Sequence, residues 1–309
     1  MEDELARWES FNDSLVWQTG TLDRSVFLSF LRAHTLGVKR SWALDRVLSR
    51  LNALGFKFRP GKIEHQCMCA YREEVHVGMP PIPSVPKGQR NPAGLQALIH
   101  RGDSWRLHDL FDHSPLRYDD DLSHTEDALH LLFSGNPLLC VGRSSSDFWT
   151  DHRLTLRGTL SDLQFIVPCV MTSHFGLTLD GRNSAHSLAN TGERKYLVIE
   201  CDYNADEVRQ LNDWGVSSTD AGAAVLGWLS HYLPLALAVW SGGKSIHGWF
   251  NLLGAPHEYV ARFMDVAYAL GADLATWRNR SQFVRMPDGL RDNGNRQSIL
   301  WMDPGACPI

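Results

Sequence analysis

The chain has 309 residues, of which 43% are hydrophobic and 21% are charged, and its formal net charge is −5. This length predicts two domains or three small ones, and the composition is typical of a globular protein with hydrophobic cores. The negative net charge excludes a uniformly basic protein, so any nucleic-acid binding needs local positive charge or metal ions. No apolar run approaches a membrane span, and the polar start MEDELARWESF is unlike a secretory signal. We therefore expect a cytoplasmic protein without membrane contact.

In the first third of the chain, the spacing of apolar residues predicts helices. Thr21 and Ser41 are the expected N-caps of two of them, and the second helix carries an apolar face that runs to Leu54 and stops at Gly55. Residues 79–94 are rich in proline and glycine and form the best linker candidate. We therefore expect residues 1–113 to be a mainly helical accessory region and residues 114–309 to be a second domain.

Cysteine usage favours reduced thiols over a disulfide framework, because the cysteines are scattered and several lie in apolar stretches. They are Cys67, Cys69, Cys140, Cys169, Cys201 and Cys307. One local group could ligate zinc and consists of His65, Cys67, Cys69 and His76. Its C-x-C spacing differs from the C-x₂₋₄-C of most structural zinc sites. We therefore predict buried or surface thiols there and no zinc site.

Beyond residue 114, helical and strand patterns alternate, which predicts an α+β fold. The expected order over residues 194–304 is β-α-β-β-α-β, that of an RRM-like sheet. Pro256 opens the second of its helices. The predicted elements in chain order are a helix at 126–133, strands at 163–172 and 196–201, helices from 205 and at 220–229, strands at 236–240 and 245–252, a helix from 256, and a final pair of strands at 283–285 and 297–302.

The first candidate site residues stand at the end of the apolar strand YLVIEC, where Glu200 and Asp202 flank Cys201. Alternate strand residues share a face, so both carboxylates are expected to project together while Cys201 turns away. Adjacent carboxylates repel one another and lose hydration, which favours a compensating cation. Mg²⁺ and Mn²⁺ take carboxylate oxygens and leave positions for substrate phosphates. The alternative interpretation is a solvated strand end.

The second candidate group lies in SGGKSIHGWF, residues 241–250. A P-loop is excluded, because it would need a glycine at Ala238 and a helix after the segment. A β-hairpin is expected instead, with Ser245 and His247 on one face of its far strand and Lys244 at the turn. These side chains suit the phosphates of a nucleotide. For His247 the alternative is a satisfied histidine on a half-buried sheet.

Two further groups follow along the chain. Asp273 comes after an amphipathic helix and, taken alone, is an ordinary loop residue. Arg285 and Arg291 flank a Pro–Gly turn, and guanidinium groups held in this way can bind triphosphate oxygens bidentately. A hairpin with two surface arginines is the alternative.

Together and in this order, these motifs resemble the archaeo-eukaryotic primase superfamily, in its plasmid- and phage-type primase-polymerase branch. That family has acid-x-acid on a strand, S-x-H on a strand, and then a third acid. YLVIECD and SGGKSIHGWF resemble the first two motifs, and Asp273, 26 residues past His247, suits the third. FVRMPDGLRDNGNRQSILW is similar to an R-x-P-G-x-R…Q hairpin of phage-type members, except that Asp288 stands where glycine is common. The likeness covers roughly residues 114–304.

The resemblance implies a two-metal, template-directed DNA primase or polymerase, of use in replicating a phage, plasmid or other mobile element. Glu200, Asp202 and Asp273 would hold two Mg²⁺ or Mn²⁺ ions, and no organic cofactor is implied. The nucleotide would be held by Ser241, Lys244, Ser245, His247, Arg285 and Arg291. The implied partners are a single-stranded DNA template, a primer strand, NTP or dNTP, and a helicase that is either separate or fused at the C-terminus. The host would be a bacterial, archaeal or phage-infected cell.

Two other functions compete with this one. A non-catalytic replication protein could keep the fold and bind nucleic acid or nucleotide, although decay would be expected to remove the three acids. A nicking initiator of the HUH type needs two histidines around one apolar residue and a tyrosine nucleophile, and no such histidine pair is present. Residues 57–117 hold nine Lys or Arg against six Asp or Glu, so this stretch could contact the phosphates of a nucleic-acid strand.

Overall fold

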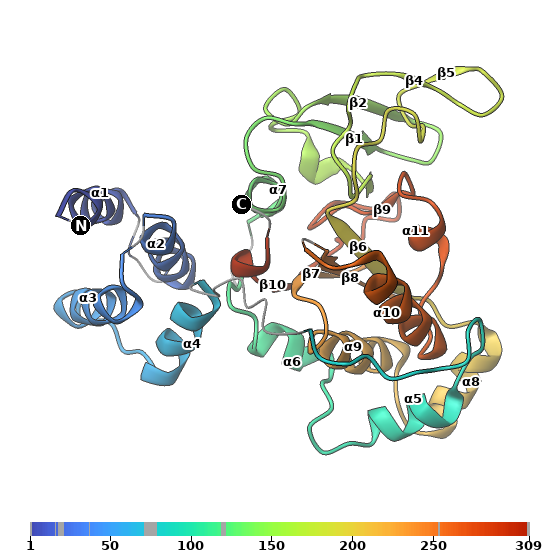
Figure 1. Cartoon of the computed structure of the whole chain (residues 1–309), viewed down its shortest axis with the longest axis horizontal. Coiled ribbons are helices and arrows are strands. Elements are labelled where there is room, and N and C mark those ends of the chain that lie inside the picture. The colour runs from blue at the N-terminus through green and yellow to red at the C-terminus, as the bar shows by residue number, and fades with distance from the viewer. Residues whose placement is uncertain are drawn as a thin grey trace.

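The computed structural model describes residues 2–15, 17, 22–36, 38–70, 79–118, 122–252 and 254–307. It is a mixed α+β protein with antiparallel sheets, and a group of helices stands to one side of them (Figure 1). Among the helices that are described, none is long and apolar enough to cross a membrane.

Four N-terminal helices pack around a hydrophobic core of their own. They are α1 (Glu2–Ser14), α2 (Leu22–Thr35), α3 (Arg40–Ala53) and α4 (Pro60–Ala70). Trp8, Phe27 and Phe30 lie fully buried at the centre of this core. The helical prediction is therefore confirmed for this region, with two corrections on α3: its N-cap is Lys39 rather than Ser41, and Leu54 is half exposed. The predicted cap Thr21 lies outside the described residues.

The next two helices, α5 (Pro92–Ile99) and α6 (Leu107–Asp112), belong with the larger core and not with the N-terminal helices. Asn91 caps α5 by accepting a hydrogen bond from Gly94 N, and Pro92 occupies the first helical position. Leu98 and Leu110 are buried against the central sheet. Residues 92–112 thus pack as part of the α/β portion of the chain.

The central sheet has four strands in the order β10 (Ile299–Met302), β7 (Leu235–Trp240), β8 (Ile246–Asn251) and β6 (Tyr196–Cys201). Side chains alternate between its two faces, because successive strand residues point to opposite sides. Leu197 and Ile199 face a core shared with α9 (Ser218–Leu229) and α10 (His257–Ala269), whereas Tyr196 and Val198 face the opposite core. The helix α8 (Ala205–Asp213) connects β6 to α9.

A second four-stranded sheet covers the other face, in the order β2 (Phe148–His152), β1 (Leu138–Gly142), β3 (Phe165–Ile166) and β9 (Val284–Arg285). It packs with α7 (Thr125–Leu132), the helix expected at 126–133. The shared core includes an aromatic cluster in which Trp249 makes edge contacts with Phe133 and Tyr196. Short elements complete the described fold: β4 (Gly176–Leu177), β5 (Asn183–Ser184), α11 (Ala275–Arg278), and the 3₁₀ turns η1 (Leu160–Asp162) and η2 (Pro304–Ala306).

Two strand predictions were wrong. The strand expected at 163–172 is reduced to β3, because Pro168 has no backbone N–H to donate to a ladder. The expected final pair of strands does not form a hairpin, since β9 pairs with β3 and β10 pairs with β7. The chain therefore crosses from one sheet to the other between Arg285 and Ile299. This crossing carries the segment with Arg291 to the end of the central sheet, where the candidate site lies.

Candidate active site at one end of the central sheet

Glu200 and His247 face each other across the β6–β8 ladder. The Nε2 atom of His247 lies 3.2 Å from Oε1 of Glu200 and 3.4 Å from the hydroxyl of Ser245. The imidazole is 2% exposed, so it faces the carboxylate and not solvent. Within the described part of the chain its Nδ1 atom has no hydrogen-bond partner. Both strands were predicted from the sequence, and their register brings these two residues together.

Asp202, which directly follows the end of β6, pairs with the turn of the β7–β8 hairpin. Lys244 Nζ lies 2.8 Å from Asp202 Oδ1, and the two side chains are 67% and 39% exposed. The Oδ1 atom is itself shielded from solvent, and the ammonium of Lys244 compensates its charge. The hairpin itself is the one predicted, and no helix follows GKS, which agrees with the exclusion of a P-loop.

Asp273 reaches the same place by pairing with the end of β6. Cys201 and Ala272 form an isolated antiparallel bridge, and Asp273 N donates to Glu200 O at 2.8 Å. Residues directly opposite each other across such a bridge share a face, so Asp273 and Glu200 project to the same side. Asp273 Oδ1 accepts a hydrogen bond from Ala275 N at 2.7 Å. The third acid is thus beside the first, although 73 residues separate them in sequence.

A tight turn at Ser241–Ser245 binds the loop that carries Arg291 and Asn295. Gly242 has a φ of +72°, a left-handed conformation that side chains other than glycine adopt at a cost. Arg291 Nη1 donates to Ser241 O at 3.2 Å, and Asn295 Nδ2 donates to Gly242 O at 2.8 Å. Asn295 is a contributor that sequence reasoning missed, and its place in the polar segment DNGNRQ was the available signal.

Arg285 enters the site from the second sheet. Its guanidinium lies over the ring of Phe165, 4.9 Å from the centroid. Burial lowers the pKa of Arg285, and the nearby charge of Arg291 lowers it further, while Glu200 and Asp292 oppose the shift. Two arginines thus lie close enough to repel each other, which is an arrangement that an anion would stabilise.

Opposing effects act on the pKa of Glu200. Burial raises it, yet the charge and hydrogen bond of His247, together with Arg285 and Lys244, outweigh burial, so the net pKa lies below the ordinary value. The carboxylate is therefore ionised and electrostatically coupled to three of the candidate nucleotide-binding residues.

Asp288, which stands where the resembled motif commonly has glycine, lies against His124 and Arg296, and its Oδ2 atom is 3.9 Å from Nη1 of Arg296. Its backbone has a φ of 56°, a left-handed conformation in which glycine is favoured and Asp is tolerated. Its carboxylate is buried and accepts a hydrogen bond from His124 N at 2.8 Å, just before α7. Burial raises the pKa of Asp288. The extra acid therefore serves the packing of this turn.

As arranged, no three described His, Cys, Asp or Glu side chains form a group that could hold a metal ion. Instead Lys244 pairs with Asp202, and His247 lies within hydrogen-bond distance of Glu200. Of the weak zinc candidates, Cys67 is buried, and burial raises its pKa to about 12 against the opposing charge of Arg40. His76 lies outside the described residues.

Comparison with protein families, characterised proteins and solved structures found no match for this chain. Its function is therefore argued from the site. The geometry places three acids and three accessible or half-buried cations, Lys244, Arg285 and Arg291, around one end of a sheet, with Ser241, Ser245 and His247 buried behind them.

Proposed function

We propose that the chain is a template-directed DNA primase-polymerase that transfers nucleotidyl groups from NTP or dNTP to a 3′-hydroxyl. The observation that carries this proposal is the cross-strand pair Glu200–His247, which has Asp202–Lys244 on one side and Asp273 on the other. Acids and cations that lie this close together suit phosphoryl transfer, because the acids can bind divalent ions and the cations can bind phosphates.

The element order supports an RRM-like catalytic core of the archaeo-eukaryotic primase type. Strands β6 and β7 run parallel with β8 between them, as in a split β-α-β unit. One feature departs from that pattern: β6, the first strand, lies at the sheet edge, whereas the first strand of an RRM-like sheet is central. The resemblance therefore rests mainly on the site motifs and on the order of the elements.

The chemistry of the three carboxylates suits Mg²⁺ or Mn²⁺, since these hard cations prefer carboxylate oxygens, although the described arrangement does not gather them into a metal-binding group. Lys244 Nζ lies 2.8 Å from Asp202 Oδ1, so this ammonium supplies the positive charge that a bound cation would also supply. Glu200, Asp202 and Asp273 would hold the ions. When bound, such ions would lower the pKa of the attacking hydroxyl and neutralise phosphate charge.

The chain's own side chains position the substrate. Lys244, Arg285 and Arg291 bind the triphosphate, because they are the cations that remain accessible or half-buried around the acids. His247 keeps Glu200 ionised and oriented. In the transfer, the 3′-hydroxyl loses its proton to solvent and its oxygen bonds to the α-phosphorus. The bond from that phosphorus to its bridging oxygen breaks, and pyrophosphate leaves with the electron pair.

A second candidate function has one observation in its favour. Asp202 is already paired with Lys244, and Glu200 already lies 3.2 Å from His247, which would suit a nucleotide-binding replication protein without catalysis. Primer extension with and without Mn²⁺ or Mg²⁺, run beside nucleotide titration, separates the two. Metal-dependent extension supports the primase-polymerase. Nucleotide binding without extension in any metal contradicts it and favours the second candidate.

A further inference from the structure

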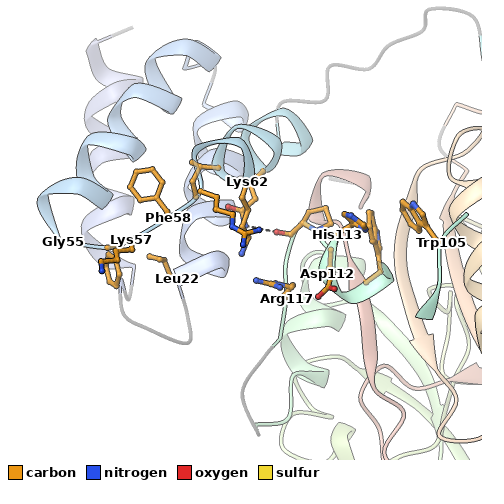
Figure 2. A pocket seen from close by; sticks show the side chains of 16 residues that line it. Leu22, Gly55, Lys57, Phe58, Lys62, Trp105, Asp112, His113 and Arg117 are labelled. Carbon is orange, nitrogen blue, oxygen red and sulfur yellow. Dashed lines mark hydrogen bonds between the residues drawn. The ribbon is translucent and has the colours of Figure 1, made fainter. Parts of the chain in front are cut away.

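A large groove lies between the N-terminal helices and the edge of the central sheet, away from the acids. Its volume is about 1140 Å³, which is above the usual range for a small-molecule pocket. One wall comes from residues 55–66 and the other from α6, the segment after it, and Trp301 of β10 (Figure 2). Because β10 and β6 are opposite edges of the sheet, the groove is distinct from the site at Glu200.

The floor of the groove joins the two parts of the chain. Gln66, one turn beyond Lys62 on α4, donates a hydrogen bond from Nε2 to Pro115 O at 2.9 Å, and Gln66 is 1% exposed. This buried hydrogen bond links the α4 wall of the groove to the segment that follows α6.

Positive charge gathers in the groove of a protein whose net charge is negative. Its basic lining residues are Lys57, Arg59, Lys62 and Arg117, and Asp112 is the acid among the lining residues. Lys57 and Arg59 are exposed. A local excess of cations in a chain of net charge −5 favours a polyanionic ligand.

A column of rings stands on the wall opposite Lys57. Trp301 contacts Trp105 at 5.2 Å between ring centroids, and His113 stacks on Trp105 at 6.0 Å with 23° between the ring planes. Trp105 is held from behind by α9, where a Cβ on Gly227 would come within 2.6 Å of its ring. His113 is exposed at the end of this column. It presents a flat face on which a base can stack.

We propose that this groove binds a single strand of nucleic acid, with its phosphates on the basic wall and a base stacked on His113. Cations and an open aromatic ring across one groove are the two requirements of single-strand binding. Under the proposed function, on which this inference rests, the bound strand is the template. It lies in the groove and outside the cluster of acids.

The test measures how tightly the protein binds a fluorescently labelled oligothymidylate of about 16 nucleotides. Fluorescence anisotropy is the readout, in a buffer that contains EDTA and no free nucleotide. His113→Ala is expected to weaken binding roughly 5- to 150-fold, the loss of one stacked base. The double variant Lys57→Gln, Arg59→Gln is expected to bind with a weaker salt dependence. The negative slope of log affinity against log salt should become shallower by roughly 1.4. The matched control is Arg46→Gln, an exposed cation of the same helical unit outside the groove, which should change little.

The outcomes separate this proposal from the catalytic one. If both groove variants bind the oligonucleotide with wild-type affinity, the proposal that the groove binds a single strand is wrong. Metal-dependent primer extension would still support the primase-polymerase in that case. Groove-dependent binding without extension would support the groove and contradict the catalytic proposal. Equal, groove-dependent binding of an oligouridylate supports the proposal, because stacking and phosphate contacts need no 2′-hydroxyl. A duplex that binds as tightly and loses as much affinity in His113→Ala overturns it.

Discussion

At the scale of single residues, the site is a set of charges that compensate each other. Asp202 and Lys244 form an exposed pair, and such pairs contribute only about 0–1 kcal/mol to stability. His247 and Glu200 form a more buried pair whose geometry is set by the strand register. The two pairs therefore differ in what their loss should do.

For Asp202, function and stability should separate. We expect Asp202→Asn to abolish nucleotide incorporation while the melting temperature stays within about 4 °C of the wild type, because only an exposed pair is lost. Primer extension and thermal unfolding measure the two effects. Asp206→Asn, which removes another acid from an exposed ion pair, should keep activity. A large fall in melting temperature for Asp202→Asn would show that the residue is structural.

For Glu200, the expected effect is a pH dependence of stability. Its folded-state pKa lies below the ordinary 4.5, so the unfolded chain binds more protons between these two values. The contribution of Glu200 is therefore present above pH 4.5 and lost as the pH falls through the folded-state pKa. Urea unfolding across pH should show the wild type losing its advantage over Glu200→Gln as the solution is acidified below 4.5.

Asp288 supplies a control of opposite sign, because burial raises its pKa above the ordinary 3.8. Its contribution is present below pH 3.8 and lost as the pH rises through the folded-state pKa. Asp288→Asn should therefore gain relative to the wild type as the pH rises. The stability advantage of the wild type over Glu200→Gln should shrink toward acid pH. If that advantage grew instead, the pairing of Glu200 with His247 would not be what lowers the pKa of Glu200.

At the scale of elements, the hairpin turn between β7 and β8 controls the placement of Arg291. A Cβ on Gly242 would lie 3.0 Å from Arg296 O and 3.2 Å from Arg291 Cδ. The turn and the loop behind it therefore pack with almost no free space. This closeness links the backbone of one motif to the side chain of another.

Gly242→Ala is expected to weaken nucleotide binding and to destabilise the protein by about 1–2 kcal/mol, because it combines left-handed strain with crowding of the arginine loop. Gly215→Ala is the matched control: its φ is +71°, and no atom lies within 4 Å of its added Cβ. It should show the strain without the loss of nucleotide affinity. Nucleotide titration of both variants decides, and equal affinities would contradict a role for the turn.

At the scale of the whole molecule, two units with separate cores meet at the groove. The N-terminal helices close around Trp8, whose Nε1 donates to Ser29 O at 2.8 Å, and the central sheet has its own cores on both faces. Separate cores allow local unfolding of one unit without the other. A substitution that destabilises the N-terminal helices should therefore weaken strand binding while the site at Glu200 stays folded.

Trp8→Ala should cost the helical unit about 3–5 kcal/mol, since a fully buried aromatic side chain is removed. Hydrogen exchange is expected to accelerate in α1–α3 and to stay unchanged in β6–β8. Trp42→Ala, in which a tryptophan of the same unit that is 45% exposed is removed, should have little effect. Faster exchange throughout the central sheet would show that the two units unfold together.

Local features of the sequence were enough to predict much of the site. The YLVIEC strand, the hairpin at SGGKS and the helix opened by Pro256 are confirmed, because strand burial, glycine turns and helix periodicity are set by near neighbours. The resemblance marked position 288 as one where glycine is common, and the left-handed backbone of Asp288 agrees with that. The resemblance based on motif order then predicted which of these residues lie together.

Only the tertiary structure decided which side chains do meet and what each one faces. The register that sets Glu200 against His247, the bridge that brings Asp273 beside them, and the crossing of β9 into a second sheet depend on contacts far apart in sequence. The pairing of Lys244 with Asp202 and the burial of His247 follow from that packing. The same is true of the groove, because its basic wall and its ring column come from two cores whose mutual placement no local pattern encodes.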